Sequence, residues 1–97
     1  MYGLIGKMRS VPGKREELLA LVFTATSKLP GCLSYIVARD PVDTTALWIT
    51  EVWTDAASHK ASLALPEVQA AITKARPLIV GFEFQVETEP VGGIGLP

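Results

Sequence analysis

The sequence of 97 residues contains no asparagine, one cysteine and one histidine. A lone cysteine, Cys32, excludes a disulfide within the chain and a metal site built from several cysteines. A lone histidine, His59, cannot form a histidine-rich metal site, so we expect no bound metal. The absence of asparagine excludes any site that needs this side chain. The net charge of −1 and the scattered basic residues give no reason to expect a nucleic-acid partner.

Long hydrophobic runs are also absent, although 48% of the residues are hydrophobic. No run is long enough to cross a bilayer, and the start shows no signal-peptide pattern, so we expect no membrane partner and a cytoplasmic location. The length predicts one domain over residues 1–97, with a core at about 2–88. The tail, residues 89–97, has no periodicity, which predicts a mobile segment or one that reaches onto a partner chain.

The stretch at residues 47–53 organises the predicted fold. Its aromatic and β-branched residues are typical of a strand, on which successive side chains point to opposite faces. Both faces are largely apolar, which predicts a central strand covered on both sides. One face carries Leu47, Ile49, Glu51 and Trp53, and the other carries Trp48, Thr50 and Val52.

Other patterns place strands and helices around this stretch. Apolar residues at helical spacing predict a first helix, ended by Pro30 and Gly31, and Thr54 or Asp55 is a plausible N-cap of a second. Pro66 ends or bends that second helix, or begins the next one. The predicted strands cover residues 2–10, 32–39, 47–53 and 82–87, and the predicted helices cover about 14–28, 54–65 and 67–76.

This order predicts an α+β fold of the ferredoxin-like type, an antiparallel sheet with helices on one face. Strand 32–39 is apolar on both faces, with Leu33, Tyr35 and Val37 opposite Cys32, Ile36 and Ala38. In strand 82–87, perfect alternation predicts that Phe82, Phe84 and Val86 share one buried face. The helices can cover only one face of the sheet. The uncovered apolar face predicts a homodimer in which two sheets meet.

The residues also match a known family. The run at residues 47–55, followed by Ala57, Ala61, Leu63 and Pro66, resembles the antibiotic-biosynthesis monooxygenase (ABM) family of the dimeric α+β barrel group. Arg9, Pro12, Gly13 and the segment 30–32 are similar to it as well. The resemblance covers residues 2–88. It implies a dimeric barrel with a pocket between sheet and helices in each subunit.

The resemblance further implies the oxidation of quinols or phenols by dioxygen without an added cofactor. A related branch binds and degrades haem, using an asparagine, a tryptophan and a histidine. The present sequence has no asparagine, and Ser62 and Ile72 stand at the matching helical positions, which argues against haem degradation. Quinol-oxidising members often carry histidine where this chain has Ser62 and Glu67, whereas Glu51 and Trp53 are retained.

Two residues are candidates for a catalytic base. Glu51 in a buried site would have a raised pKa and could accept a proton from a phenol, although pairing with Arg9, Arg39 or Lys7 is the favoured alternative. His59 is the only side chain that titrates near neutral pH when unperturbed. Its distance from Ala57 and Ala61 favours an outward position on the second helix.

Four residues are candidates for contacts with a substrate: Trp53, Tyr35, Trp48 and Ser62. Trp53 would stack on an aromatic ring, or lie in the core or a dimer interface. Tyr35 and Trp48 are expected in the core or in the pocket wall, and Cys32 is expected to be a small core residue rather than a nucleophile. The leading hypothesis is a cofactor-independent monooxygenase for an aromatic or quinol-like molecule. The alternatives are a binding module that has lost the chemistry, and a structural dimer with a filled pocket.

Overall fold

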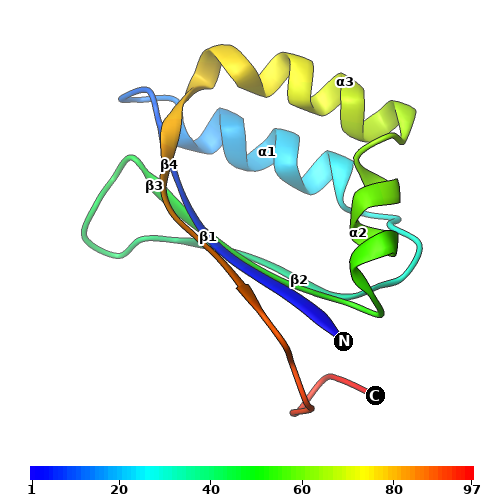
Figure 1. Ribbon diagram of the computed structural model, residues 1–97. Helices are drawn as coiled ribbons and strands as arrows, with labels where there is room; N and C mark the ends of the chain where they lie inside the picture. Colours follow the sequence, from blue (N-terminus) through cyan, green and yellow to red (C-terminus); the bar gives the residue numbers. More distant parts are fainter.

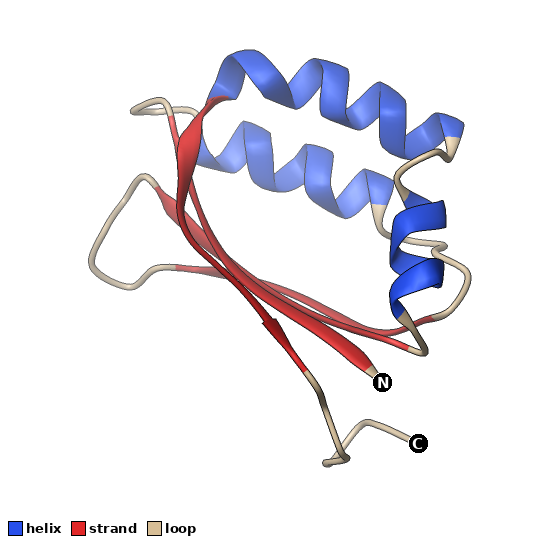
Figure 2. Cartoon of the chain, in the orientation of Figure 1, coloured by secondary structure: helices blue, strands red, loops and turns tan.

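The computed structural model describes residues 1–97 and contains one four-stranded sheet, in the order β2-β3-β1-β4, with every neighbouring pair antiparallel. Helices α1 and α3 lie on one face of the sheet, and α2 stands at one end of the two layers (Figure 1, Figure 2). The strands are β1 (Tyr2–Ser10), β2 (Cys32–Arg39), β3 (Ala46–Trp53) and β4 (Ile79–Thr88). The helices are α1 (Arg15–Ala25), α2 (Ala56–Ser62), α3 (Pro66–Ala75) and the short 3₁₀ helix η1 (Arg76–Leu78). The predicted ferredoxin-like fold is confirmed.

Strand β3 is central, as predicted, and forms an antiparallel hairpin with β2. Residues directly opposite each other in an antiparallel pair point to the same face. Leu4 pairs with Glu51 and Met8 with Leu47, so the odd-numbered residues of β3 from Leu47 to Trp53 face the helices. The even-numbered residues, including Trp48, face outward.

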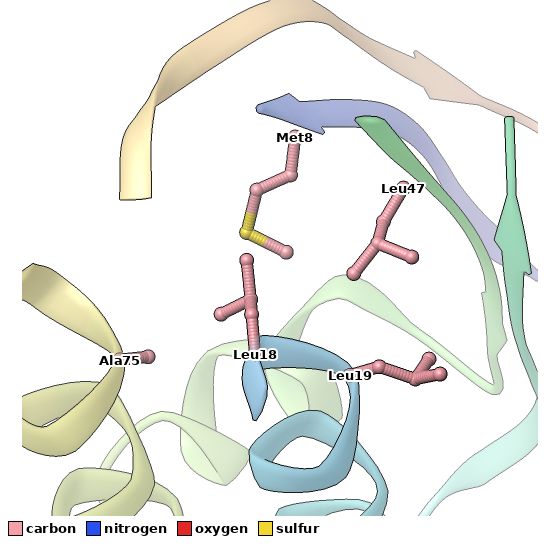
Figure 3. Close-up of a cluster of buried hydrophobic side chains, with 5 residues drawn as sticks. All are labelled: Met8, Leu18, Leu19, Leu47 and Ala75. Carbon is pink, nitrogen blue, oxygen red and sulfur yellow. The ribbon is translucent and has the colours of Figure 1, made fainter. Parts of the chain in front are cut away.

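The hydrophobic core lies toward the end of the sheet that is far from α2. Five buried side chains from β1, β3, α1 and α3 converge there (Figure 3). Leu18 and Leu47 are completely buried. The cluster comprises Met8, Leu18, Leu19, Leu47 and Ala75. Two of these residues, Met8 and Ala75, also line a cavity between the sheet and the helices.

Helix α1 is shorter than predicted, since it ends at Ala25 and not near Lys28. The hydroxyls of Thr24 and Thr26 donate to the carbonyl oxygens of Ala20 and Val22, at 2.9 Å each. At Thr26 the hydroxyl occupies the carbonyl oxygen of Val22, and the backbone N–H bonds to that of Phe23 instead, so the α-helical pattern ends there.

Strand β4 is longer than predicted, and a bulge divides its apolar residues between the two faces. Met8 pairs with Phe82 and its neighbour Lys7 pairs with Phe84, so β4 has one residue more than β1 at this point. Phe82 therefore faces the helices, whereas Phe84 and Val86 lie on the outer face. The predicted common face for these three residues is wrong, because a bulge shifts the alternation by one residue.

A second register shift corrects the prediction for β2. Cys32 pairs with Trp53 and Ser34 pairs with Val52, so Cys32 lies on the helix side together with Tyr35 and not on the face of Ile36. The thiol of Cys32 lies 3.5 Å from the carbonyl oxygen of Ser34.

The outer face of the sheet is uncovered in the single chain (Figure 2). Three large apolar side chains on it are well exposed: Ile36 by 56%, Phe84 by 45% and Val86 by 38%. One corner of this face is polar, since Lys7 and Arg9 both form ion pairs with Glu83. None of the helices has the length and apolar character that a bilayer crossing requires.

Candidate functional site

A cavity of about 320 Å³ lies between the sheet and helices α1 and α3. Most of its wall is apolar, and α2 contributes His59, Ser62 and Leu63 at one end. Five of the six predicted site residues belong to the wall. These wall residues are Tyr35, Glu51, Trp53, His59 and Ser62, and Trp48 is absent from the set.

Strand β3 supplies the first two polar groups of the site. Glu51 and Trp53 are two residues apart on one strand and therefore point to the same face. The indole Nε1 of Trp53 donates to Oε1 of Glu51 at 3.0 Å, and Trp53 itself is only 1% exposed. A fully packed indole thus holds the carboxylate in one position.

Helix α2 supplies His59, and its first turn is fixed from two sides. Of the two predicted N-cap residues, Thr54 and Asp55, the structure has Asp55. Its side chain accepts a hydrogen bond from the backbone N–H of Ser58 at 2.7 Å. Gly31 (φ +81°) lies so close that a Cβ there would be 2.6 Å from Oγ of Ser58. This close approach sets the position of α2 against the start of β2.

His59 points into the site, which corrects the predicted outward orientation. Its Nε2 lies 4.0 Å from Oε1 of Glu51, and its side chain is 21% exposed. The rings of Trp53 and Tyr2 lie 5.4 and 5.5 Å from the imidazole, centroid to centroid. Tyr2 was not a predicted site residue, although the pairing of β1 with β3 places it directly opposite Trp53.

The environment of Glu51 is that of a perturbed acid. Burial raises the pKa of its carboxyl, and the bond from Trp53 and the nearby His59 oppose this rise. The favoured pairing of Glu51 with Arg9, Arg39 or Lys7 is wrong, because these bases lie elsewhere. Their partners are Asp43 and Glu83 for Arg9, Glu16 for Arg39, and Asp40 and Glu83 for Lys7.

The remaining candidates divide between the two faces of the sheet. Burial raises the pKa of Tyr35, whose phenol therefore stays protonated, and burial also raises the pKa of the Cys32 thiol. The buried hydroxyl of Ser62 donates to the carbonyl oxygen of His59 at 2.6 Å, which occupies it within α2. Trp48 lies on the outer face, where its Nε1 donates to Oδ2 of Asp40 at 2.9 Å. It therefore cannot contact a molecule in the cavity.

The site has the groups for proton transfer and ring stacking. A carboxylate with a raised pKa and an imidazole can both accept a proton, and Trp53 and Tyr35 offer aromatic walls. Nowhere do three or more histidine, cysteine or acidic side chains gather in a way that could hold a metal ion.

The chain is similar to known proteins in sequence and in fold. Residues 1–74 match the family model described as antibiotic biosynthesis monooxygenase. The chain belongs to this family. A crystal structure of a candidate ABM protein from Chloroflexus aurantiacus J-10-fl is 57% identical, with a TM-score of 0.96 over 99% of this chain and 98% of that one.

More distant solved structures share the fold. A candidate ABM protein from Deinococcus radiodurans is 26% identical, with a TM-score of 0.79 and coverage of 97% and 96% of the two chains. A protein from Pseudomonas aeruginosa is 22% identical, with a TM-score of 0.76 and coverage of 94% of each chain. No functionally curated protein matches the chain.

Proposed function

We propose that the protein is a cofactor-independent monooxygenase that oxidises a phenolic or quinol-like aromatic molecule with dioxygen. Membership of the ABM family supports a monooxygenase of this general type. The observation that carries the substrate class is the cluster of Glu51, His59 and Trp53 at the polar end of an apolar cavity. An apolar cavity accepts an aromatic ring, and the cluster receives its hydroxyl group.

Glu51 and His59 act together as the base. Trp53 fixes the carboxylate, and the carboxylate and the two flanking rings hold the imidazole. Removal of the phenolic proton leaves an electron-rich anion, which passes one electron to dioxygen. The resulting aromatic radical and superoxide combine into a C–O bond, and loss of water completes the reaction. One hydroquinone and one dioxygen thus yield one hydroxyquinone and one water, with the protein supplying orientation and a dry environment.

Oxygen uptake with a panel of hydroquinones and naphthols tests this proposal. We expect consumption above that of heat-treated protein, and label from ¹⁸O₂ in the product. Glu51→Gln and His59→Gln should each lower kcat by on the order of 10²-fold, as for the loss of a general base. Lys60→Gln, on the exposed neighbour of His59, is the matched control and should leave kcat unchanged. Ligand binding without any oxygen uptake would contradict the proposal and favour a binding module.

We also propose a homodimer joined through the outer face of the sheet. The exposure of Ile36, Phe84 and Val86 supports it, because a fully exposed side chain of this size forfeits about 1.5–3 kcal/mol of burial energy. Two-fold symmetry would bring the same patch of both copies together. The cytoplasmic location stays a prediction from the sequence.

Light scattering during size exclusion tests the dimer. The expected mass is twice that of the 10.4 kDa chain. Ile36→Lys should shift the mass toward that of a single chain, because it places a charge within the proposed interface. The same substitution at the exposed Val42, which lies in the loop between β2 and β3, is the control. A folded wild-type protein at the mass of one chain would refute the interface.

A further inference from the structure

The cavity is polar at one end only. Glu51 pairs with Leu4 on one side and with Tyr35 on the other, whereas Met8 and Phe82 mark the other end. Four residues of β1 separate these two levels, which corresponds to about 13 Å along the strand. Ionisable and phenolic groups therefore gather at the end near α2, and the opposite end offers none.

Two further polar side chains in the wall do not change this distribution. The hydroxyl of Thr26, the C-cap of α1, is occupied because it donates to the carbonyl oxygen of Val22. Gln85 lies on the edge strand β4 and is exposed to solvent. Beyond the polar end, a ligand meets apolar side chains such as Val22, Ile72 and Ile79.

The cavity is also larger than one aromatic ring requires. A cavity of about 150 Å³ is enough to bind benzene, and this one measures about 320 Å³. A single ring placed against Glu51 and His59 would leave about half of the volume empty or filled with water. Water in the apolar half would lack the two to four polar partners that it needs.

Resting on the proposed function, the geometry points to a substrate with polar groups at one end only, namely a phenol or hydroquinone that carries an apolar extension of several carbons opposite its reacting hydroxyl. The hydroxyl lies at Glu51 and His59. The extension runs between the sheet and α3 toward Phe82, which is 56% exposed and forms an apolar rim on the edge strand. A second polar group within the extension is disfavoured, because it would leave water for a stretch of wall that offers it no ionisable or phenolic partner.

Binding of redox-inert para-alkylphenols tests this inference without any turnover. The dissociation constants of para-methylphenol, para-butylphenol and para-hexylphenol are measured by calorimetry on the wild-type protein. Each added CH₂ group should tighten binding about fourfold, as expected for its burial in an apolar site. A hydroxyl group at the end of the hexyl chain should remove most of this gain. Equal affinity along the series, or no binding of any member, would overturn the inference.

Two matched variants locate the extension. Ala71 on α3 lines the cavity, whereas its neighbour Ala70 is exposed and lies outside the wall. Ala71→Leu should weaken para-hexylphenol at least tenfold and leave para-methylphenol within about twofold. Ala70→Leu adds the same atoms to the same helix and should change neither affinity. If Ala71→Leu weakens both phenols equally, the extension does not lie along α3 and the inference fails.

Oxygen uptake separates this inference from the proposed function. Affinity that rises with chain length, with no oxygen consumed by any hydroquinone, would refute the oxidation and leave the one-ended ligand standing. Oxygen consumed with unsubstituted hydroquinone, together with a flat binding series, would refute the one-ended ligand and leave the oxidation standing.

Discussion

Replacement of Trp53 by phenylalanine removes the bond that positions Glu51 and keeps an aromatic ring in the core. The lost bond joins an indole N–H to a carboxylate at 3.0 Å, and such bonds contribute about 1.5–3 kcal/mol. The smaller ring leaves a cavity at a site that is 1% exposed, with a further cost on the order of 1–2 kcal/mol. A total of about 3–5 kcal/mol is a large share of the 5–15 kcal/mol that stabilises a typical domain.

A double-mutant cycle isolates the bond from the packing. Trp53→Phe and Glu51→Leu are made singly and together, and urea unfolding is followed at one fixed protein concentration and pH 7. The coupling energy should be about 1.5–3 kcal/mol, since either single change already breaks the bond. Effects that add to within about 0.5 kcal/mol would refute the role of Trp53 in holding Glu51.

The outer face of the same strand provides the control. Trp48 donates to Asp40 at 2.9 Å, which is the same indole–carboxylate pair. Asp40 also accepts from the backbone N–H groups of Val42 and Asp43, at 2.9 and 2.8 Å. These bonds, with that of Trp48, lower the pKa of Asp40 to about 2, whereas burial raises that of Glu51. The coupling energy between Trp48 and Asp40 should therefore be smaller than that between Trp53 and Glu51, because two backbone donors to Asp40 remain after Trp48→Phe.

Three further predictions concern pH dependence and stability. Burial raises the pKa of folded Glu51 above its ordinary value of 4.5, so the folded state keeps this proton at a pH where the unfolded chain has lost it. As the pH rises from 4.5 through the raised pKa, the stability of the wild type should therefore fall relative to that of Glu51→Gln, by at most about 1.4 kcal/mol per pH unit. Equal pH dependence of the two proteins in urea unfolding would contradict this. Leu18→Ala in the core should cost about 2–5 kcal/mol in the same assay, and a cost under 1 would be inconsistent with its complete burial. Gly31→Ala should destabilise by more than about 1 kcal/mol, because φ is +81° and the Cβ meets Ser58, whereas Gly13→Ala, with equal φ and open space, should cost less.

The alternation of side chains made the central part of the fold predictable. Because side chains alternate along β3, Glu51 and Trp53 share one face and Trp48 lies on the other. The pairing with β1 confirms this placement. The strand–helix order and the apolar spacing sufficed for the ferredoxin-like arrangement. Such patterns are local, and regular strands obey them.

The bulges in β2 and β4 were not predictable from the same patterns. A bulge adds one residue, so every later side chain changes face while the sequence pattern stays the same. Phe82 thereby joins the cavity and Phe84 leaves the predicted common face. In β2, Cys32 changes face in the same way.

The orientation of His59 depended on tertiary structure. Helix α2 has only seven residues and closes one end of the two layers, so the spacing of its small apolar residues does not define its inner face. What turns His59 inward is the contact of α2 with Gly31 and with the ends of β1 and β3, where Tyr2 and Trp53 flank the imidazole.

The two faces of β3 separate the candidate site from the proposed interface. Glu51, Trp53 and His59 lie on the helix side and all come from one chain, whereas Ile36 and Phe84 lie on the outer face. A substitution on the outer face therefore removes no group from the cavity, and it can affect the site only by loosening the sheet that both faces share. In a folded but dissociated variant, the affinity for a ligand thus reports on the cavity, and any loss of stability reports on the interface.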